Sequence, residues 1–294
     1  MVIEAGRVNY ATAADGVTVA YQRFGRGPPI LRVPMLPLAL RVQPLLGDVS
    51  GLHSLSPSVS VVTWDPRGTG MSDRAVTDAS VDAWLADAVA VAEAVGATLP
   101  VHATAMEGPI ALLLASRRPD LVSHLILVTT GADGEELAQN PAQKSVMALL
   151  EVDWDLCLNF ILRAILRMDH AAADDLVEIL RDEIDPDVMR EAYESFRGVD
   201  VRHLISDLAV PTLVLETRRL RPQRDLAAGG RALSRLIPGA QMAQIADRSE
   251  LRDHIVAFLP QPQLVETHGV FRTIMFTDLV SSTALTQRAV SYTH

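Results

Sequence analysis

Short apolar runs rich in β-branched residues alternate along most of the chain with longer segments whose apolar residues recur at helical spacing. This alternation is typical of a mostly parallel sheet covered by helices on both faces, so it predicts an α/β fold. The opening segment 17–29 reads as a β-hairpin arm and a turn. The other predicted strands are 30–33, 59–64, 101–103, 125–129, 211–215 and 241–245, and the predicted helices are 80–95, 108–116, 226–236 and 249–259.

The segment 135–199 departs from this alternation and reads as consecutive helices with an apolar stripe between Trp154 and Leu166. Insertions of this kind commonly form a lid over a site. The proline-rich stretch at 260–262 then marks a linker. We therefore expect a core made of 1–134 and 200–260, a helical lid at 135–199, a linker at 261–269 and a separate final segment at 270–294.

The composition and charge of the chain disfavour several classes of protein. The chain has 294 residues, a formal net charge of -10 and one cysteine, Cys157, so an internal disulfide is impossible. The excess of acidic side chains disfavours nucleic acid and anionic membranes as partners, because both need clustered Lys and Arg. No apolar run reaches the ~18 to 20 residues of a membrane span, and no signal sequence is recognisable at the N-terminus. We expect a cytoplasmic protein.

The strand, turn and helix at 101–116 have the layout in which a sharp turn presents a nucleophile above the sheet, the G-x-S-x-G elbow. The motifs that accompany it are W-D-P-R-G-T-G-M-S-D at 64–73, G-P-I-A-L-L-L-A at 108–115 and P-T-L-V-L at 211–215. With these motifs the chain resembles α/β-hydrolases, specifically the hydrolase-like domains that precede class III nucleotide cyclases in multidomain bacterial proteins. The resemblance covers nearly all of 8–259 and implies an α/β-hydrolase fold with a helical lid.

The catalytic triad that the resemblance implies is not intact. The elbow reads A-T-A-M-E at 103–107, so the nucleophile position is Ala105, whose methyl group cannot attack a carbonyl carbon. The position of the histidine falls at Glu250, and the carboxylate nearest to the third position is Asp225. Because both elbow glycines are also replaced, we expect the strained turn to have relaxed.

A ligand pocket is still conceivable at this place. The loop that normally supplies oxyanion donors reads P-M-L-P at 34–37, which removes backbone N–H groups and adds apolar bulk. Such a pocket favours a small apolar or amphipathic molecule. Glu107 is the strongest polar candidate, because a carboxylate beside the elbow could orient a ligand amine or hydroxyl group. The predicted lining residues are Pro34, Met35, Ala105, Met106 and Glu107.

Other charged residues and histidines are interpreted as structural. In the family that the chain resembles, the stretch containing Asp65, Arg67 and Asp73 shapes a turn and packs a loop. His102 and His124 adjoin strands and are interpreted as scaffold histidines with satisfied hydrogen bonds.

The final segment carries a second resemblance. The sequence V-F-R-T-I-M-F-T-D-L-V-S-S-T at 270–283 is similar to the first strand and turn of class III adenylate or guanylate cyclases. In that family the aspartate matched by Asp278 binds Mg²⁺ or Mn²⁺, whereas the second metal-binding aspartate has no counterpart in this chain. The segment 270–294 is therefore expected to be a truncated start of a cyclase domain, and the hydrolase-like part is expected to need no cofactor.

Three functions remain open from the sequence. The first is a catalytically silent ligand-binding module that regulates a cyclase domain in the same parent chain. The second is an esterase-like hydrolase of unusual mechanism, using water activated by Glu250, Glu107 or Asp225, or a serine such as Ser72 or Ser249. The third is a structural or dimerising domain with a collapsed pocket. The final segment itself is expected to dock on its own domain, to pair with a second copy in a homodimer, or to be disordered.

Overall fold

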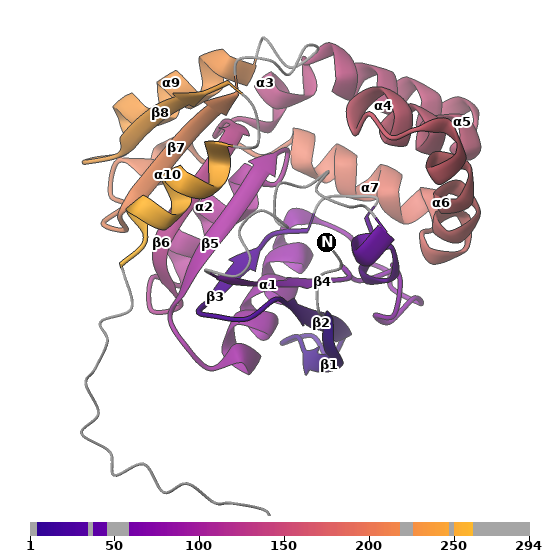
Figure 1. Ribbon diagram of the computed structural model, residues 1–294, viewed down its shortest axis with the longest axis horizontal. Coiled ribbons are helices and arrows are strands. Elements are labelled where there is room, and N and C mark those ends of the chain that lie inside the picture. Colours follow the sequence, from indigo (N-terminus) through magenta and orange to yellow (C-terminus); the bar gives the residue numbers. More distant parts are fainter. Residues whose placement is uncertain (1–4, 35–37, 46–58, 218–225, 247–249, 261–294) are drawn as a thin grey trace, which may run out of the picture. The chain divides into compact units, whose positions relative to one another are not determined.

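The computed structural model describes residues 5–34, 38–45, 59–217, 226–246 and 250–260, with the backbone alone for 226–228. Within these residues eight strands form one sheet in the order β1-β2-β4-β3-β5-β6-β7-β8 (Figure 1). Their bounds are β1 Ala5–Thr12, β2 Thr18–Phe24, β3 Pro29–Arg32, β4 Ser60–Trp64, β5 Leu99–Ala105, β6 Val122–Thr130, β7 Thr212–Thr217 and β8 Gln241–Ile245.

The sheet is mostly parallel. β1 pairs with β2 and β2 pairs with β4 in antiparallel register, so the predicted hairpin arm is β2, and its hairpin partner is β1, a strand that was not predicted. All pairs from β4 through β3, β5, β6 and β7 to β8 are parallel. Parallel neighbours align the carboxyl ends of β3, β5, β6 and β7 at one edge, where ligands commonly bind in open α/β sheets.

Helices cover both faces of this sheet. On one face, apolar residues of α1 (Val81–Val95), α2 (Gly108–Arg117) and α9 (Leu226–Leu236) share a core with the strands. On the other face α10 (Leu251–Phe258) contributes Leu251 and Ile255, which pack with strand residues such as Ile126 and Leu213. Successive residues of a strand face opposite sides of the sheet. Because helices cover both sides, both sets of residues are buried, which explains the continuous apolar runs of the strands. The predicted α/β architecture is confirmed.

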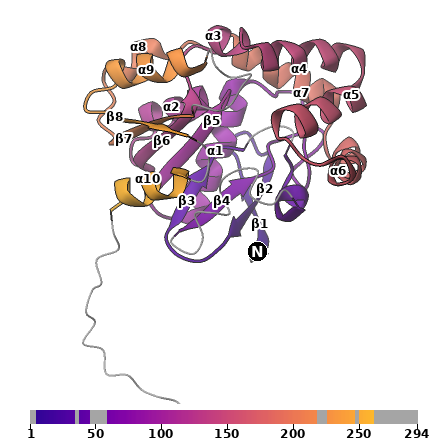
Figure 2. The ribbon, with the colours of Figure 1, turned by 45° about the horizontal axis from the view of Figure 1, so that its top comes forward.

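Between β6 and β7 the chain forms the segment that we call the lid, from α3 to α7. Its elements are α3 Gly134–Ala138, α4 Pro141–Val152, α5 Trp154–Asn159, the π-helical turn η4 Phe160–Ile165, α6 His170–Glu183 and α7 Pro186–Arg197. The short helix α8, Arg202–Ile205, leads back to the sheet. Figures 1 and 2 show α4 to α7 beyond the carboxyl end of β5. The lid therefore stands over the edge where a site is expected.

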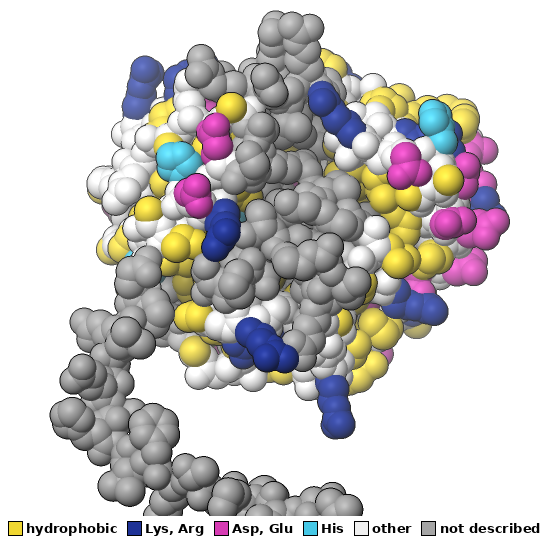
Figure 3. Space-filling model, in the orientation of Figure 1, with side chains coloured by type: hydrophobic (Ala, Val, Ile, Leu, Met, Phe, Trp, Pro, Cys, Tyr) yellow, Lys and Arg dark blue, Asp and Glu magenta, His cyan; other side chains and the backbone are white. Residues whose placement is uncertain are grey.

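Side-chain caps explain where several of these helices begin. The Ser80 hydroxyl accepts a hydrogen bond from Ala83 N at the start of α1, and Asp169 caps α6 in the same way. α7 begins with Asp185 followed by Pro186, a residue that suits the first turn because no intrahelical partner is lost there. α6 exposes Asp174, Asp175, Glu178 and Asp182, and acidic side chains gather on this part of the surface (Figure 3).

The structure corrects one predicted strand and one predicted helix. The strand expected at 101–103 extends over Leu99–Ala105 and includes Pro100. A register shift between Leu99 and Pro100 lets the strand tolerate a residue that has no N–H to donate. The apolar stripe of the lid is divided between α5 and η4, so its helical spacing is interrupted, although Leu158, Ile161 and Leu162 are all buried.

Backbone and side-chain contacts connect the lid to loops at the edge of the sheet. Thr69 in the loop after β4 bridges Ile184 at the end of α6, and Gly70 N donates to the carbonyl oxygen of Glu183 at 2.7 Å. The buried Glu183 carboxylate in turn pairs with Arg41 at 2.6 Å, in the 3-10 helix η1 (Leu40–Leu45). Backbone and side-chain contacts together therefore fix one side of the lid over the sheet edge.

Candidate functional site

The backbone at the end of β5 keeps the sharp turn of a nucleophile elbow. Ala105 is the last residue of β5, has a φ of 48°, and is followed after two residues by the start of α2. A left-handed conformation costs a residue with a Cβ atom roughly 1–2 kcal/mol. The expectation that the turn has relaxed is therefore wrong, because the surrounding contacts hold the strained conformation without a nucleophile.

Two contacts of β6 explain why the turn persists. The Thr130 hydroxyl donates a hydrogen bond to the carbonyl oxygen of Ala105. Gly108, the first residue of α2, lies so close to Thr130 that an added Cβ would come within 2.0 Å of its Oγ1 atom. This glycine follows the elbow directly and supplies the close approach of helix and strand that the turn requires.

The positions predicted for the other triad members provide no histidine. Glu250 stands immediately before α10, is exposed, and its carboxylate accepts a hydrogen bond from Ala246 N at 2.9 Å. Asp225, Ser249, Met35 and Asp278 lie outside the described residues. Ala105 itself is 9% exposed and presents only a methyl group. No acyl transfer to position 105 is chemically available.

Glu107 brings an ionisable group into the buried part of this site. It forms the N-cap of α2, and its side chain is buried. The Thr104 hydroxyl lies 3.5 Å from one carboxyl oxygen, a long and weak contact. Burial raises the pKa of Glu107 to about 8, so the group is a neutral acid at pH 7. The sequence identified this residue but treated it as a carboxylate.

The lid contributes Tyr193 to the same region. This tyrosine lies on α7, is buried, and interacts electrostatically with both Glu107 and Cys157. Burial raises the pKa of its phenol, and burial also raises the pKa of the Cys157 thiol to about 12. The thiol points its weak donor at the carbonyl oxygen of Val146, 3.6 Å away. Sequence reasoning missed Tyr193, because nothing in the pattern of α7 separates it from a core residue.

Arg32 and His102 stand side by side on β3 and β5, where they are register partners. Both are buried, and Arg32 interacts electrostatically with His102 and with Glu107. Burial lowers the pKa of His102 to about 3, so its ring is neutral. Neither ring nitrogen has a hydrogen-bond partner among the described residues. The prediction that His102 is a satisfied scaffold histidine is therefore wrong within the part of the chain that the structure describes.

His124 lies further from the carboxyl edge, at the Pro100 position of the register. Its ring meets the Phe258 ring of α10 edge-on, with centroids 5.3 Å apart, and burial lowers its pKa. This contact gives it a packing role between sheet and helix, but the prediction that its hydrogen bonds are satisfied is wrong for Nδ1, which has no partner in the described part of the chain.

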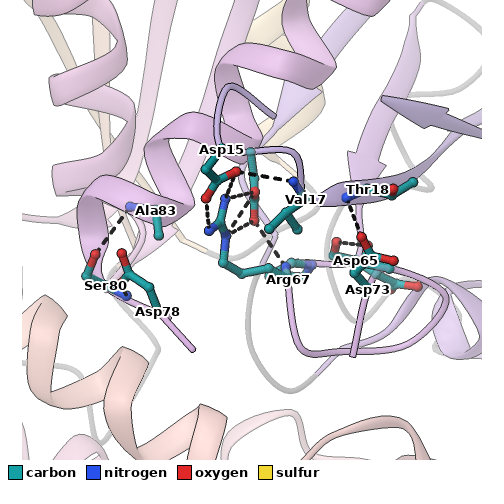
Figure 4. Close-up of polar contacts among 12 residues, drawn as sticks. Asp15, Val17, Thr18, Asp65, Arg67, Asp73, Asp78, Ser80 and Ala83 are labelled. Carbon is teal, nitrogen blue, oxygen red and sulfur yellow. Dashed lines mark hydrogen bonds and ion pairs between the residues drawn. The ribbon is translucent and has the colours of Figure 1, made fainter. Parts of the chain in front are cut away.

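The loop after β4 is a structural network, as its plain interpretation predicted (Figure 4). The Arg67 guanidinium, 1% exposed, donates to Asp87 of α1 at 2.8 Å and to Asp15 at 2.5 Å. Asp73 accepts from Thr18 N at 2.7 Å. These contacts tie the loop to the β1–β2 turn and to α1, so the buried Arg67 and Asp87 side chains stabilise the loop.

Asp65 and Ser72 are engaged in the same loop. The Asp65 carboxylate accepts hydrogen bonds from Leu40 N at 2.6 Å and Met71 N at 2.9 Å, while burial raises its pKa to about 6. The Ser72 hydroxyl donates to the Asp65 carbonyl oxygen at 2.6 Å and accepts from Ala20 N at 2.8 Å. Ser72 is therefore a poor candidate for a substitute nucleophile, because its oxygen is committed to two hydrogen bonds with the backbone.

Neither a metal centre nor a membrane helix is found in the described ranges. They contain no group of three or more His, Cys, Asp or Glu side chains placed to hold a metal ion. The described helices are also too short or too polar to cross a bilayer.

Comparison with known proteins identifies the fold. Neither a protein-family model nor a curated protein matches the sequence. Among solved structures, an esterase from Rhodococcus sp. ECU1013 is 20% identical with a TM-score of 0.70, covering 85% of this chain and 98% of that chain. A bromoperoxidase from Bacillus anthracis is 15% identical with a TM-score of 0.69, covering 86% and 99%.

An enol-lactonase from Burkholderia xenovorans is similar at 19% identity and a TM-score of 0.62, covering 85% of this chain and 96% of that chain. Sequence identities this low show only that the folds are similar. The eight-stranded, mostly parallel sheet, the elbow after β5 and the helices between β6 and β7 are thus those of an α/β-hydrolase fold.

Proposed function

We propose that this α/β-hydrolase-like protein binds a small apolar or amphipathic molecule beneath the lid and does not hydrolyse it. The observation that carries the proposal is Ala105, which occupies the elbow backbone with a φ of 48° and has no nucleophilic atom. A strained turn held by its neighbours preserves the shape of the site while the chemistry is lost. Pro34, Met35, Ala105, Met106 and Glu107 are the residues proposed to line it.

The composition of the described surroundings supports a binding role. Pro34, Ala105 and Met106 are apolar and buried, and Glu107 and Tyr193 supply a small number of polar groups. Small-molecule sites are typically apolar with a few placed hydrogen-bonding groups. Among the described groups near Ala105, His102 is neutral with a low pKa, and burial keeps Glu107 mostly protonated at pH 7, so little of it is present as an ionised base.

A hydrolase of unusual mechanism is the second candidate. Its support is the fold shared with an esterase and an enol-lactonase, together with a buried acid, Glu107, that could donate a proton. Water activated by Glu250, Glu107 or Asp225 would then replace the serine. The ligand-binding role is preferred, because Ala105 supplies no nucleophile, Glu107 is mostly protonated at pH 7, and Glu250 is exposed and accepts a hydrogen bond from Ala246 N.

The regulatory part of the proposal rests on sequence resemblance alone. The stretch 270–283 is similar to the start of class III cyclases, with Asp278 at the metal-binding position for Mg²⁺ or Mn²⁺. We infer that ligand occupancy in the hydrolase-like part acts on a cyclase domain of the parent protein. A structural or dimerising role for the same fold would need no ligand, so binding distinguishes the two.

The test measures binding of medium-length acyl and aromatic compounds through the shift in melting temperature. A ligand that binds only the folded state stabilises it and raises this temperature. Ala105→Trp should fill the proposed site and abolish the shift while the apo protein stays folded. Val152→Trp, at a position 75% exposed on α4, is the matched control and should leave the shift unchanged. A shift that persists in Ala105→Trp places the ligand elsewhere and overturns the proposal.

A further inference from the structure

The sheet ends in two outer strands, β1 and β8. Within the described residues β1 pairs with β2 alone and β8 with β7 alone, so each has one strand neighbour. Figures 1 and 2 show β8 at one end of the sheet, beyond β7. The outer side of such a strand offers backbone N–H and C=O groups to a strand of another chain, and proteins commonly block it with bulges, charges or proline.

β1 has two of these protective features. Its register with β2 shifts between Ala5 and Val8, and the charged residue Arg7 lies within this irregular stretch. The Asn9 side chain also donates a hydrogen bond to the carbonyl oxygen of Arg7 at 3.0 Å, which occupies a backbone acceptor. Another strand would therefore meet an irregular and charged backbone at this end of the sheet.

β8 has none of these features. Its residues Gln241–Ile245 pair with Leu213–Thr217 in unbroken register. The sequence Q-M-A-Q-I contains no charged residue and no proline. Ala243 is half-buried and Ile245 is buried, whereas the other three residues are exposed, with Met242 at 36%. This end of the sheet is therefore regular, uncharged and accessible in the part of the chain that the structure describes.

The geometry points to β8 as the edge at which two copies of this chain pair across a twofold axis. A twofold axis brings the same surface of both copies together, and an axis perpendicular to the sheet places the two β8 strands antiparallel. The strands then exchange backbone hydrogen bonds, and the two sheets become continuous. This inference goes beyond the proposed function and is independent of it, because it uses no residue of the elbow.

The side chains of β8 are compatible with pairing to their own copy. In this arrangement the axis passes between one residue and the same residue of the second copy. With Ala243 on the axis, Met242 lies opposite Gln244 of the other copy, and Gln241 lies opposite Ile245. Like charges directly opposite each other destabilise a strand pair, and this pairing contains none.

The charged groups beside β8 are already paired within each copy. On the α9 side, the Met242 sulfur lies 3.3 Å from the Ser234 hydroxyl oxygen, and the Gln244 amide lies 3.4 Å from the buried Glu216 carboxylate. Arg231 of α9 contacts the same carboxylate at 3.3 Å. A strongly basic or acidic peptide would thus find no opposite charge on β8, whereas a second copy needs none. This favours the second copy as the occupant.

Cysteine cross-linking tests the pairing directly. Cys157, the one cysteine of the chain, is buried, and burial raises the pKa of its thiol to about 12, so it should stay unreactive. Opposite residues of antiparallel strands have Cα atoms roughly 4.5–5.5 Å apart, a distance that a disulfide spans. Ala243→Cys should therefore form a disulfide-linked dimer with oxidised glutathione. Met242→Cys and Gln244→Cys cover an axis displaced by one residue.

The matched control lies on the other outer strand. Tyr10→Cys, at a position 58% exposed on β1, should give no cross-linked dimer under the same conditions. Analytical ultracentrifugation of the wild type should show a reversible dimer. Met242→Lys places two charges near the axis and should raise its dissociation constant at least about 10-fold, whereas Tyr10→Lys should leave it unchanged.

The competing occupant is the apolar run at 270–276 in the final segment. Ile274→Lys should leave the dimer and the cross-link unchanged. Loss of both in this variant would assign the pairing to the final segment and overturn the proposal.

Two further results would also overturn it. One is a wild type that stays monomeric at every concentration tested, and the other is a dimer in which none of the three β8 cysteines cross-links. Thermal unfolding checks that each variant is folded, and the cysteine variants decide if Met242→Lys does not fold. The proposed function is tested separately, because the shift in melting temperature with ligand should persist in Met242→Lys.

Discussion

The Thr130 hydroxyl donates a hydrogen bond to the carbonyl oxygen of Ala105, and this contact ties the strained end of β5 to the end of β6. Ala105 keeps a φ of 48° although its side chain performs no chemistry. The elbow is thus a property of the packed scaffold, in which a β6 side chain and the close approach of Gly108 determine the backbone.

Replacing Ala105 with Gly tests this strain. Glycine adopts a positive φ without a steric penalty, so the variant should be about 1–2 kcal/mol more stable than Ala103→Gly. Ala103 is the matched control, because it is buried on the same strand, loses the same methyl group and has no positive φ. Urea unfolding of both variants measures the difference. Equal stabilities would contradict a strained elbow.

Glu107 should make the stability of the protein depend on pH. Its folded pKa of about 8 lies above the ordinary value of 4.5, so the folded state holds a proton that the unfolded state releases between these values. The stability from this group is fully present below pH 4.5 and is lost as the pH rises to about 8, at up to about 1.4 kcal/mol per pH unit.

The side chain introduced in Glu107→Gln cannot ionise, so this variant should not show the loss of stability that Glu107 causes as the pH rises. Chemical unfolding at a series of pH values from 5 to 9 should show the stability of the variant gaining on that of the wild type as the pH rises. Glu93→Gln serves as the exposed control and should track the wild type. Parallel curves for Glu107→Gln and the wild type would show that Glu107 is not a buried neutral acid.

The Arg67 network should dominate the stability of the loop after β4. Arg67→Met leaves the Asp87 carboxylate buried without its partner, which typically costs about 3–5 kcal/mol. Arg118→Met removes solvent-exposed pairs with Glu93 and Asp120 and should change the unfolding midpoint little. Similar losses of stability in the two arginine variants would contradict this prediction.

The resemblance of the final segment makes a negative prediction about synthesis of cyclic nucleotides. Asp278 is the metal-binding position that the resemblance supplies, and two aspartates are needed to hold the ions on a triphosphate. The 294-residue chain should therefore form no cAMP or cGMP from ATP or GTP with Mg²⁺ or Mn²⁺. Formation of either product by the purified protein, detected by mass spectrometry, would contradict this interpretation.

Much of the architecture could be predicted from the sequence because its signals are local. Runs such as 211–215 and the helical spacing of 80–95 determine element type, and motif order then indicates the fold. The alanine at position 105 was also visible. The charge state of Glu107 was not, because it depends on burial by segments that are distant in the sequence.

The contacts of the site depended on tertiary structure in the same way. Tyr193 interacts electrostatically with Glu107 only because the lid folds back over the sheet, and its place on α7 resembles that of any buried aromatic residue. The persistence of the elbow was mispredicted, because local rules associate a positive φ with glycine whereas Thr130 and Gly108 impose it from a neighbouring strand and helix.

The central claim is that the elbow binds without catalysing hydrolysis, and ester turnover tests it most directly. Release of p-nitrophenol from p-nitrophenyl acetate, butyrate and octanoate should stay at the rate of buffer for the wild type. Ala105→Ser should recover little, because triad members act as a unit and the position predicted for the histidine carries Glu250. A robust wild-type turnover that disappears on mutating a single residue, such as Glu107 or Glu250, would contradict the account and establish a hydrolase.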